Sequence, residues 1–204
     1  MFISLALKKT MADLRAVVQD PLVPLKGCAS LDIRQVTAFT PSQSHASDYS
    51  QGPITVVSKE PYLPIDRTKL SKALLTELNK LQWRDAEFFK AAGVDFITGE
   101  EASDVDFKGK KVSLKKSGKT LGYDKLILST GGTPRKLPLE GFDASNVFVL
   151  RTQVHAKEIN AALGDYKDKK VAIIGTSFIG MELANCLAGK GAKVTLIGIE
   201  KAPL

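Results

Sequence analysis

Hydrophobic positions are grouped in short runs from about residue 53 to the end of the chain. Runs of β-branched and aliphatic residues predict strands at 53–58, 94–98, 111–115, 125–129, 170–174 and 193–197. Apolar residues spaced three and four apart predict helices at 69–79, 83–92, 154–163 and 177–190. Since most of the strands alternate with helices, this pattern predicts an α/β fold built on parallel sheets.

The first 51 residues follow a different pattern and are left unassigned. Residues 1–7 are apolar, but this run is too short for the core of a signal peptide. The spacing of apolar residues over 7–18 predicts a short amphipathic helix. Residues 37–51 are rich in Ser, Thr, Gln and Pro, which is typical of a loop or linker.

Composition and charge exclude several broad classes of protein. The chain has 204 residues, 44% hydrophobic and 25% charged, as in globular proteins rather than disordered or collagen-like ones. No run approaches the ~20 apolar residues of a membrane span, so no membrane span is expected.

Many of the lysines that give the net charge of +7 lie between 108 and 119, around a turn at 117–118. Without interleaved aromatic residues they indicate the solvated rim of a hairpin, and no nucleic-acid partner is expected.

Cysteine and histidine residues are too few and too scattered for a metal or disulfide centre. Cys28 and Cys186 cannot form a disulfide framework, and the two histidines lie far from both in the sequence. Without a closely spaced cysteine pair, a redox disulfide is excluded. We therefore expect no bound metal, and we interpret Cys186 as a core residue of its helix.

The most informative motif is a glycine-containing turn between a predicted strand and a predicted helix. Val171–Ile174 runs directly into Gly175-Thr-Ser-Phe-Ile-Gly180, and a second strand follows the helix. This order is typical of a dinucleotide-binding unit, in which Gly175 allows a tight turn and Gly180 allows the helix to pack closely. The first backbone N–H groups of the helix would face a pyrophosphate. Ser177 takes the position of the middle glycine of the motif, and its hydroxyl can donate a hydrogen bond to phosphate. The alternative is a crossover whose glycines serve packing only.

The end of the second strand carries the residues expected to distinguish NADH from NADPH. Gly198 stands where a ribose-binding carboxylate is usual, and Glu200 follows it closely. Glu200 bound to the adenosine ribose would favour NADH, whereas Gly198 with Lys201 would admit the extra phosphate of NADPH. The sequence leaves both alternatives open.

A second nucleotide-binding region is indicated by Glu60, which follows the strand at 53–58 as a ribose-binding carboxylate would. A surface glutamate after a strand is the equal alternative. Further along, Arg67 can bind an anionic group with two parallel hydrogen bonds, and Lys72 can do so as a point charge. Solvated cations at the proline-rich start of a helix are the alternative for these two residues.

Several segments resemble, in the correct order, the FAD-dependent pyridine nucleotide oxidoreductases. They are 60–72, similar to E-x-x-x-P-Y-D-R-P-x-L-S-K, 129–135, similar to A-T-G-x-x-P-R, 150–152, similar to L-R-T, and 175–182 with 202–204, similar to the NAD-binding unit. The first departs from the family pattern at Ile65 and Thr68. The resemblance extends over 52–204 and is nearest to the ferredoxin/rubredoxin reductase and apoptosis-inducing-factor-like group, fungal members in particular.

This resemblance implies an incomplete Rossmann-like, three-layer fold that binds FAD and NAD(P)H, with parallel sheets and a small antiparallel hairpin insertion. Hydride would pass from nicotinamide to flavin, and Lys72 and Glu182 would be the catalytic residues beside the reacting rings. The residues implied to bind FAD or NAD(P)H are Glu60, Arg67, Lys72, Ala102, Thr130, Gly131, Arg135, Arg151, Gly175, Ser177, Gly180 and Glu200.

Two departures from the family pattern lead us to expect an incomplete chain. No glycine occurs between 40 and 51, where the family has the turn that binds the FAD pyrophosphate. The sequence also ends just after the second strand of the NAD-binding unit. We therefore expect an unassigned segment over 1–51, a partial FAD-binding domain over 52–150 and the start of an NAD(P)-binding domain over 151–204.

The predicted function is that of an FAD-dependent NAD(P)H oxidoreductase, impaired by the missing parts, that passes electrons to an acceptor protein or a quinone. The alternatives are a non-catalytic NAD-binding or interaction module and an inactive fragment. The expected compartment is the cytoplasm, with the mitochondrion as the alternative.

Overall fold

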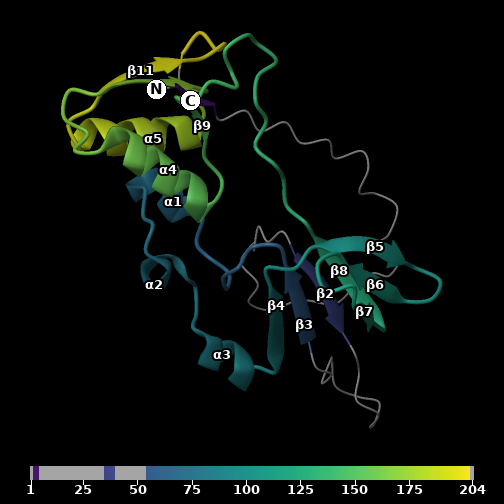
Figure 1. The fold of residues 1–204 in the computed structure, drawn as a ribbon. Coiled ribbons are helices and arrows are strands. Elements are labelled where there is room, and N and C mark those ends of the chain that lie inside the picture. The colour runs from purple at the N-terminus through teal and green to yellow at the C-terminus, as the bar shows by residue number, and fades with distance from the viewer. Residues whose placement is uncertain (1, 5–34, 40–53, 203–204) are drawn as a thin grey trace. The chain divides into compact units, whose positions relative to one another are not determined.

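The computed structural model describes residues 2–4, 35–39 and 54–202 (Figure 1). The chain divides into two compact units, which are described separately. Of the described residues, unit 1 contains 2–4, 65–81 and 133–202, and unit 2 contains 35–39, 54–64 and 82–132. The helix predicted over 7–18 lies outside the described residues.

Unit 1 is built on a four-stranded sheet in which all neighbouring strands are parallel, as the alternating pattern predicts. The strand order is β11 (Lys193–Ile197), β10 (Lys170–Ile174), β1 (Phe2–Ser4) and β9 (Val147–Val149). The helices α4 (Gln153–Leu163) and α5 (Phe178–Gly189) lie on the same side of this sheet (Figure 1). The core of unit 1 contains Ile159, Leu163, Val171, Ile173, Leu183 and Leu187, each at most 2% exposed.

The helix predicted over 69–79 is interrupted in the structure. α1 (Thr68–Ala73) ends at Leu74, whose φ of 48° is left-handed, and α2 (Leu78–Leu81) begins only after a gap. A left-handed leucine is sterically unfavourable, so the surrounding structure must hold it. Leu74 is 2% exposed, which indicates that burial of its side chain fixes the break.

Two side chains of α4 hold the segment between α1 and α2 by hydrogen bonds to its backbone. Asn160 Nδ2 donates to the Leu74 carbonyl at 3.0 Å, and Gln153 Nε2 donates to the Thr76 carbonyl at 2.6 Å. These bonds pair carbonyl groups that a continuous helix would have paired internally. The tertiary contacts therefore override a local pattern that favours one longer helix.

Unit 2 contains a mixed sheet with the order β4 (Val94–Thr98), β3 (Ile54–Ser58), β2 (Gln35–Phe39) and β8 (Lys125–Ser129). β3 and β4 are parallel, whereas β2 is antiparallel to both of its neighbours. The predicted loop over 37–51 is therefore wrong at its start, which belongs to β2. The segment Q-V-T-A-F includes residues with good strand propensity, and pairing on both sides stabilises a strand that the local pattern does not reveal.

A second, antiparallel sheet forms the predicted hairpin region of unit 2. It consists of β5 (Ala102–Asp106), β6 (Lys111–Leu114) and β7 (Thr120–Gly122). The carboxylate of Glu100 holds its turn, because it accepts hydrogen bonds from the backbone N–H groups of Lys116 at 2.7 Å and Ser117 at 3.0 Å. The lysines between 108 and 119 are exposed, as expected of a solvated rim.

The helix predicted over 83–92 is shorter in the structure. α3 (Ala86–Ala91) begins at its cap, because the Asp85 side chain accepts a hydrogen bond from the Phe88 N–H at 2.8 Å. Among the residues that the structure describes, no helix is both long enough and apolar enough to cross a bilayer.

Candidate functional site

The glycine turn of unit 1 has the backbone geometry that the motif predicts. Gly175 has a φ of 119°, which favours glycine, and its N–H donates to the Ile197 carbonyl at 2.8 Å, so the turn is joined to the end of β11. Ser177 is the extended N-cap residue of α5, and its side chain makes no capping hydrogen bond. The exposed Ser177 hydroxyl and the first N–H groups of α5 are thus placed at one helix N-terminus.

Gly180 is required by the close approach of α5 to the turn. A Cβ atom at this position would overlap the carbonyl oxygen of Gly175. At Gly189, in the same helix, an added Cβ atom would have nothing within 4 Å. Close packing of helix on strand therefore explains Gly180 and brings the N-terminus of α5 against the turn.

Thr176 links the glycine turn to the residues that follow β11. Its hydroxyl donates to Oε2 of Glu200 at 2.7 Å, and this bond contributes most to lowering the pKa of the Glu200 carboxyl below its ordinary value. A Cβ atom at Gly198 would overlap the Thr176 side chain. Glu200 is therefore held beside the turn, although it lies two positions beyond residue 198, where the carboxylate usually stands.

The two predicted catalytic residues, Lys72 and Glu182, form an ion pair within unit 1. Lys72 Nζ lies 2.6 Å from Oε1 of Glu182, and the Ser71 hydroxyl donates to Oε2 at 2.5 Å. The hydrogen bond from Lys72 and then that from Ser71 lower the pKa of Glu182 below its ordinary value. The carboxylate is thus held in its ionised form, and Lys72 itself is exposed.

Among the other predicted residues of unit 1, Arg67 and Arg151 are brought together. Arg67 Nη1 donates to the Arg151 backbone carbonyl at 2.7 Å, which ties the start of α1 to the segment before α4. Arg135 is exposed in the segment between β8 and β9. These contacts show how Arg67 is oriented, and the binding of a cofactor by the three arginines stays a prediction.

The remaining predicted FAD-binding residues lie in unit 2. Glu60 follows β3 and Thr130-Gly131 follows β8, and these two strands end at the same edge of the sheet because both are antiparallel to β2. The Glu60 backbone is fixed by an N–H bond to the Ser58 hydroxyl oxygen at 3.2 Å. Ala102 begins β5. The predicted FAD contacts are therefore divided between the two units, with Arg67, Lys72 and Arg135 in unit 1.

Two polar residues of the site escape prediction from the sequence. Ser71 shares the Glu182 carboxylate with Lys72, and Thr176 binds Glu200. The only indication of Thr176 in the sequence is the glycine at position 198, where a carboxylate is usual. The Thr176 side chain fills the space that a Cβ atom at 198 would need. Ser71 offers none, because its partner lies 111 positions away in the chain.

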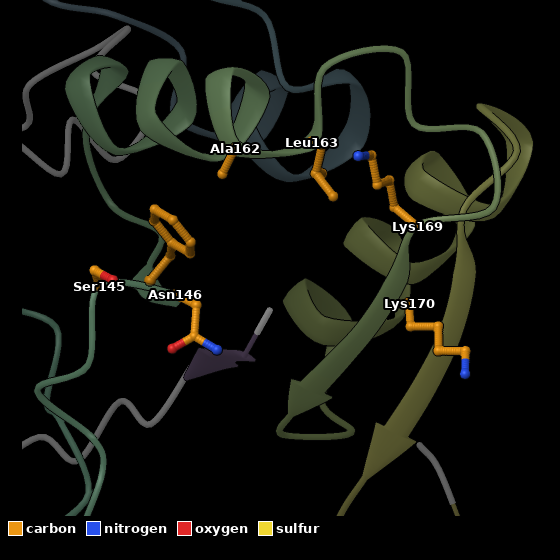
Figure 2. Close-up of a pocket in the computed structure, with 7 residues that line it drawn as sticks. Ser145, Asn146, Ala162, Leu163, Lys169 and Lys170 are labelled. Carbon is orange, nitrogen blue, oxygen red and sulfur yellow. The ribbon is translucent and has the colours of Figure 1, made fainter.

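Unit 1 contains a pocket of about 300 Å³ (Figure 2). It is lined by Ser145, Asn146, Phe148, Ala162, Leu163, Lys169 and Lys170. These residues stand where β9 and β10 begin and α4 ends, whereas the glycine turn follows the other end of β10. Figure 2 shows Lys169 beside Leu163 and Lys170 turned away. The pocket is therefore separate from the predicted dinucleotide site.

Cys186 lies on α5 and is half-buried. Burial raises the pKa of its thiol, which is the opposite of what a reactive cysteine requires. This agrees with a packing role for Cys186. Cys28 lies outside the described residues.

Comparison with known proteins gives one family and several relatives. Residues 37–204 match the family described as pyridine nucleotide-disulphide oxidoreductase. The chain is 35% identical to apoptosis-inducing factor 3 of Mus musculus over 150 residues, which is 74% of this chain and 24% of that protein. It is 33% identical to rubredoxin-NAD(+) reductase of Pseudomonas putida over 156 residues, which is 75% of this chain and 39% of that protein.

Among solved structures, the covalent putidaredoxin reductase–putidaredoxin complex resembles this chain with a TM-score of 0.66 and 29% identity. The similarity covers 74% of this chain and 37% of that one. NADH:rubredoxin oxidoreductase from Clostridium acetobutylicum gives a TM-score of 0.64 at 26% identity. The chain thus spans well under half the length of each of these relatives and solved structures.

Proposed function

Since this chain belongs to the pyridine nucleotide-disulphide oxidoreductase family, we propose that unit 1 binds NAD(P)H and that the chain takes part in hydride transfer from the nicotinamide to FAD. The family and its reductase members use FAD and NAD(P)H, and their Rossmann-like α/β fold is that of this chain. NAD(P)H bound here would supply a hydride, and FAD would accept it.

The close packing of Gly180 on Gly175 carries this proposal. It presents the N–H groups at the start of α5 to the space beyond the turn, where the helix dipole favours an anion. The first turn of α5 contains no acidic residue that would repel a pyrophosphate. The Ser177 hydroxyl adds a donor that is not engaged in capping. These residues fit the pyrophosphate of a dinucleotide.

The Lys72–Glu182 pair would orient the reacting groups. Glu182 lies on α5, the helix that follows the glycine turn, and the resemblance to the family implies that it faces the nicotinamide end of a dinucleotide held there. Ser71 and Lys72 keep the carboxylate charged and in one place, and the exposed Lys72 ammonium offers its other donors to a ligand. We assign Glu182 to the nicotinamide and Lys72 to the flavin ring edge on the resemblance to the family.

The fit of unit 2 to FAD is partial. Glu60 stands after β3, as a carboxylate that binds the adenosine ribose would. On the side of β3 away from β4, its neighbour is β2, which is antiparallel to it, and the sequence from 40 to 51 contains no glycine. A strand followed by a glycine turn and a helix needs a parallel neighbour at this position. This observation favours a second candidate function, an NAD(P)H-binding module without flavin chemistry.

The acceptor of the electrons is a further part of the proposal. Relatives are named as reductases of rubredoxin and as a ferredoxin–NAD(+) reductase subunit, and one solved structure is a complex with putidaredoxin. A small electron-carrier protein is therefore the acceptor we propose here, with a quinone as the alternative. We keep the cytoplasm as the proposed compartment and the mitochondrion as the alternative.

Thermal unfolding and visible absorbance of the purified 204-residue chain test the proposal. NADH and ADP-ribose are expected to raise the Tm, whereas adenosine, which has no pyrophosphate, is the matched control and is expected to raise it little. Flavin absorption bands that persist after gel filtration with FAD would support the flavoprotein reaction. An NADH shift without retained flavin would favour the binding module. A folded chain that NADH does not stabilise would contradict both.

A further inference from the structure

The glycine turn and the end of β11 interlock through Thr176. Gly198 stands where the ribose-binding carboxylate is usual, and a Cβ atom there would overlap the Thr176 side chain. Thr176 is only 8% exposed, although it belongs to a surface turn. Its hydroxyl donates to Glu200 at 2.7 Å. Thr176 therefore fills the space beside position 198 and binds the next carboxylate along the chain.

We propose that Thr176 is a positioning residue that holds Glu200 at the adenosine ribose and so makes unit 1 select NADH over NADPH. The inference rests on the proposed function, because it requires a dinucleotide at the N-terminus of α5. It concerns the adenosine end of that ligand, which is remote from the Lys72–Glu182 pair along the predicted dinucleotide.

The chemistry of the two coenzymes differs at the group that Glu200 would meet. The ribose of NADH carries two adjacent hydroxyl groups, and both can donate to a carboxylate. In NADPH one of them is a phosphate, which has no such donor and is repelled by a fixed negative charge. A carboxylate has two oxygens with several acceptor sites, so Glu200 can bind Thr176 and a ribose at once.

The hydrogen bond from Thr176 matters because Glu200 is otherwise exposed. An exposed glutamate samples several rotamers and loses this freedom when it binds a ligand. The bond to Thr176 fixes the side chain beforehand, so that binding of the ribose costs less conformational entropy. Removing the hydroxyl should therefore weaken NADH binding without changing the backbone of the turn.

Lys201 is the competing determinant, because a cation beside the ribose would instead attract the NADPH phosphate. It is exposed and follows Glu200 directly. Substitutions of Glu200 and of Lys201 would affect the binding of the two coenzymes differently. If Lys201 set the preference, Lys201→Ala would weaken NADPH binding alone, whereas Glu200→Gln would leave NADH binding unchanged.

The experiment measures the dissociation constants of NADH and NADPH for the full 204-residue chain by titration calorimetry. Thr176→Val keeps the shape of the side chain and removes the hydroxyl, and we expect it to weaken NADH binding about fivefold, as the loss of one hydrogen bond does. Glu200→Gln is expected to lower the ratio of the NADPH to the NADH constant about tenfold. Thr176→Ser restores the donor and should keep the wild-type ratio, and Lys201→Ala should leave the NADH constant unchanged.

The double variant gives a readout that a merely structural role of Thr176 would not move. Thr176→Val should have little effect on NADH binding once Glu200→Gln is present, because both act through one carboxylate. A ratio that stays at the wild-type value in Glu200→Gln would overturn the inference. Because Glu200 is exposed, this variant changes no packed atom, so it tests the inference even if Thr176→Val fails to fold. Tighter binding of NADPH than of NADH by the wild-type chain would also overturn it. A folded wild-type chain that binds neither coenzyme would instead overturn the proposed function.

Discussion

Gly180 and Gly189 belong to the same helix but differ in what surrounds them. A Cβ atom at Gly180 would overlap a backbone carbonyl, while one at Gly189 would meet open space. Gly180→Ala is expected to lower the free energy of unfolding by about 1–3 kcal/mol, because backbone atoms must move apart. It should also weaken NADH binding at least tenfold, since the N-terminus of α5 would move away from the turn. Urea unfolding and calorimetry measure the two effects.

Gly189→Ala is the matched control for this prediction. The same chemical change at an open helical position should leave NADH binding unchanged, and it should leave stability unchanged or raise it by up to about 1 kcal/mol through helix propensity. Equal losses of NADH affinity in the two variants would contradict the geometric role of Gly180.

The Glu182 carboxylate makes a pH-dependent contribution to stability. Its pKa in the folded chain is lowered by Lys72 and then Ser71, so the contribution is present above the ordinary pKa of 4.5 and is lost as the pH falls through the lower folded value. Glu182→Gln is expected to reduce stability by about 1 kcal/mol at pH 7, because the pair is partly exposed. As the pH falls through this lower folded pKa, the two proteins should converge in stability. Urea unfolding at a series of pH values measures this, and a gap that does not narrow in acid would contradict it.

α1 is the element that brings Ser71 and Lys72 to Glu182, although it is too short to be stable alone. It packs against α5, and the segment that follows it is held by Asn160 and Gln153 of α4. The position of the Lys72–Glu182 ion pair therefore depends on α4 and α5, which lie far from α1 in the sequence. This explains why the helical pattern over 69–79 predicts too long a helix.

Gln153→Ala tests the attachment of this segment to α4. The variant leaves the Thr76 carbonyl without its donor, and Gln153 is only 5% exposed, so we expect stability to fall by about 1–3 kcal/mol. The exposed Lys157→Ala in the same helix is the control and should change stability by less than about 0.5 kcal/mol. Thermal unfolding of both variants provides the measurement. Equal Tm values for the two would show that the Gln153 bond contributes nothing.

At the scale of the whole molecule, the division into two units predicts a local response to coenzyme. The glycine turn, α5 and β11 belong to unit 1, whereas the hairpin sheet belongs to unit 2. NADH at about 100 times its dissociation constant should stabilise the state that binds it by about 2.7 kcal/mol. Hydrogen exchange should therefore slow in β10, α5 and β11 and remain unchanged in β5, β6 and β7. Uniform protection of both units would contradict this local response.

The family relationship and the site could be predicted from local sequence because glycine turns and helical periodicity depend on nearby residues. The turn at Gly175 and the helix that follows it were predicted in this way. The binding roles of Glu182, which rests on the resemblance to the family, and of Glu200 stay predictions. The partners of these residues were not predicted, because Lys72 and Glu182 lie 110 positions apart and no short-range pattern connects them.

The sequence by itself determined that a strand, a glycine turn and a helix follow one another at 170–190, since left-handed backbone and apolar spacing are local properties. Only the tertiary structure decided which strands pair. It placed β1 between β9 and β10, and β2 between β3 and β8, from a segment with no clear local signal. It also brought Thr176, which follows β10, into a hydrogen bond with Glu200, which follows β11. Strand pairing and side-chain hydrogen bonds bring together distant residues, and their energies depend on the whole set of neighbours rather than on any stretch of the chain.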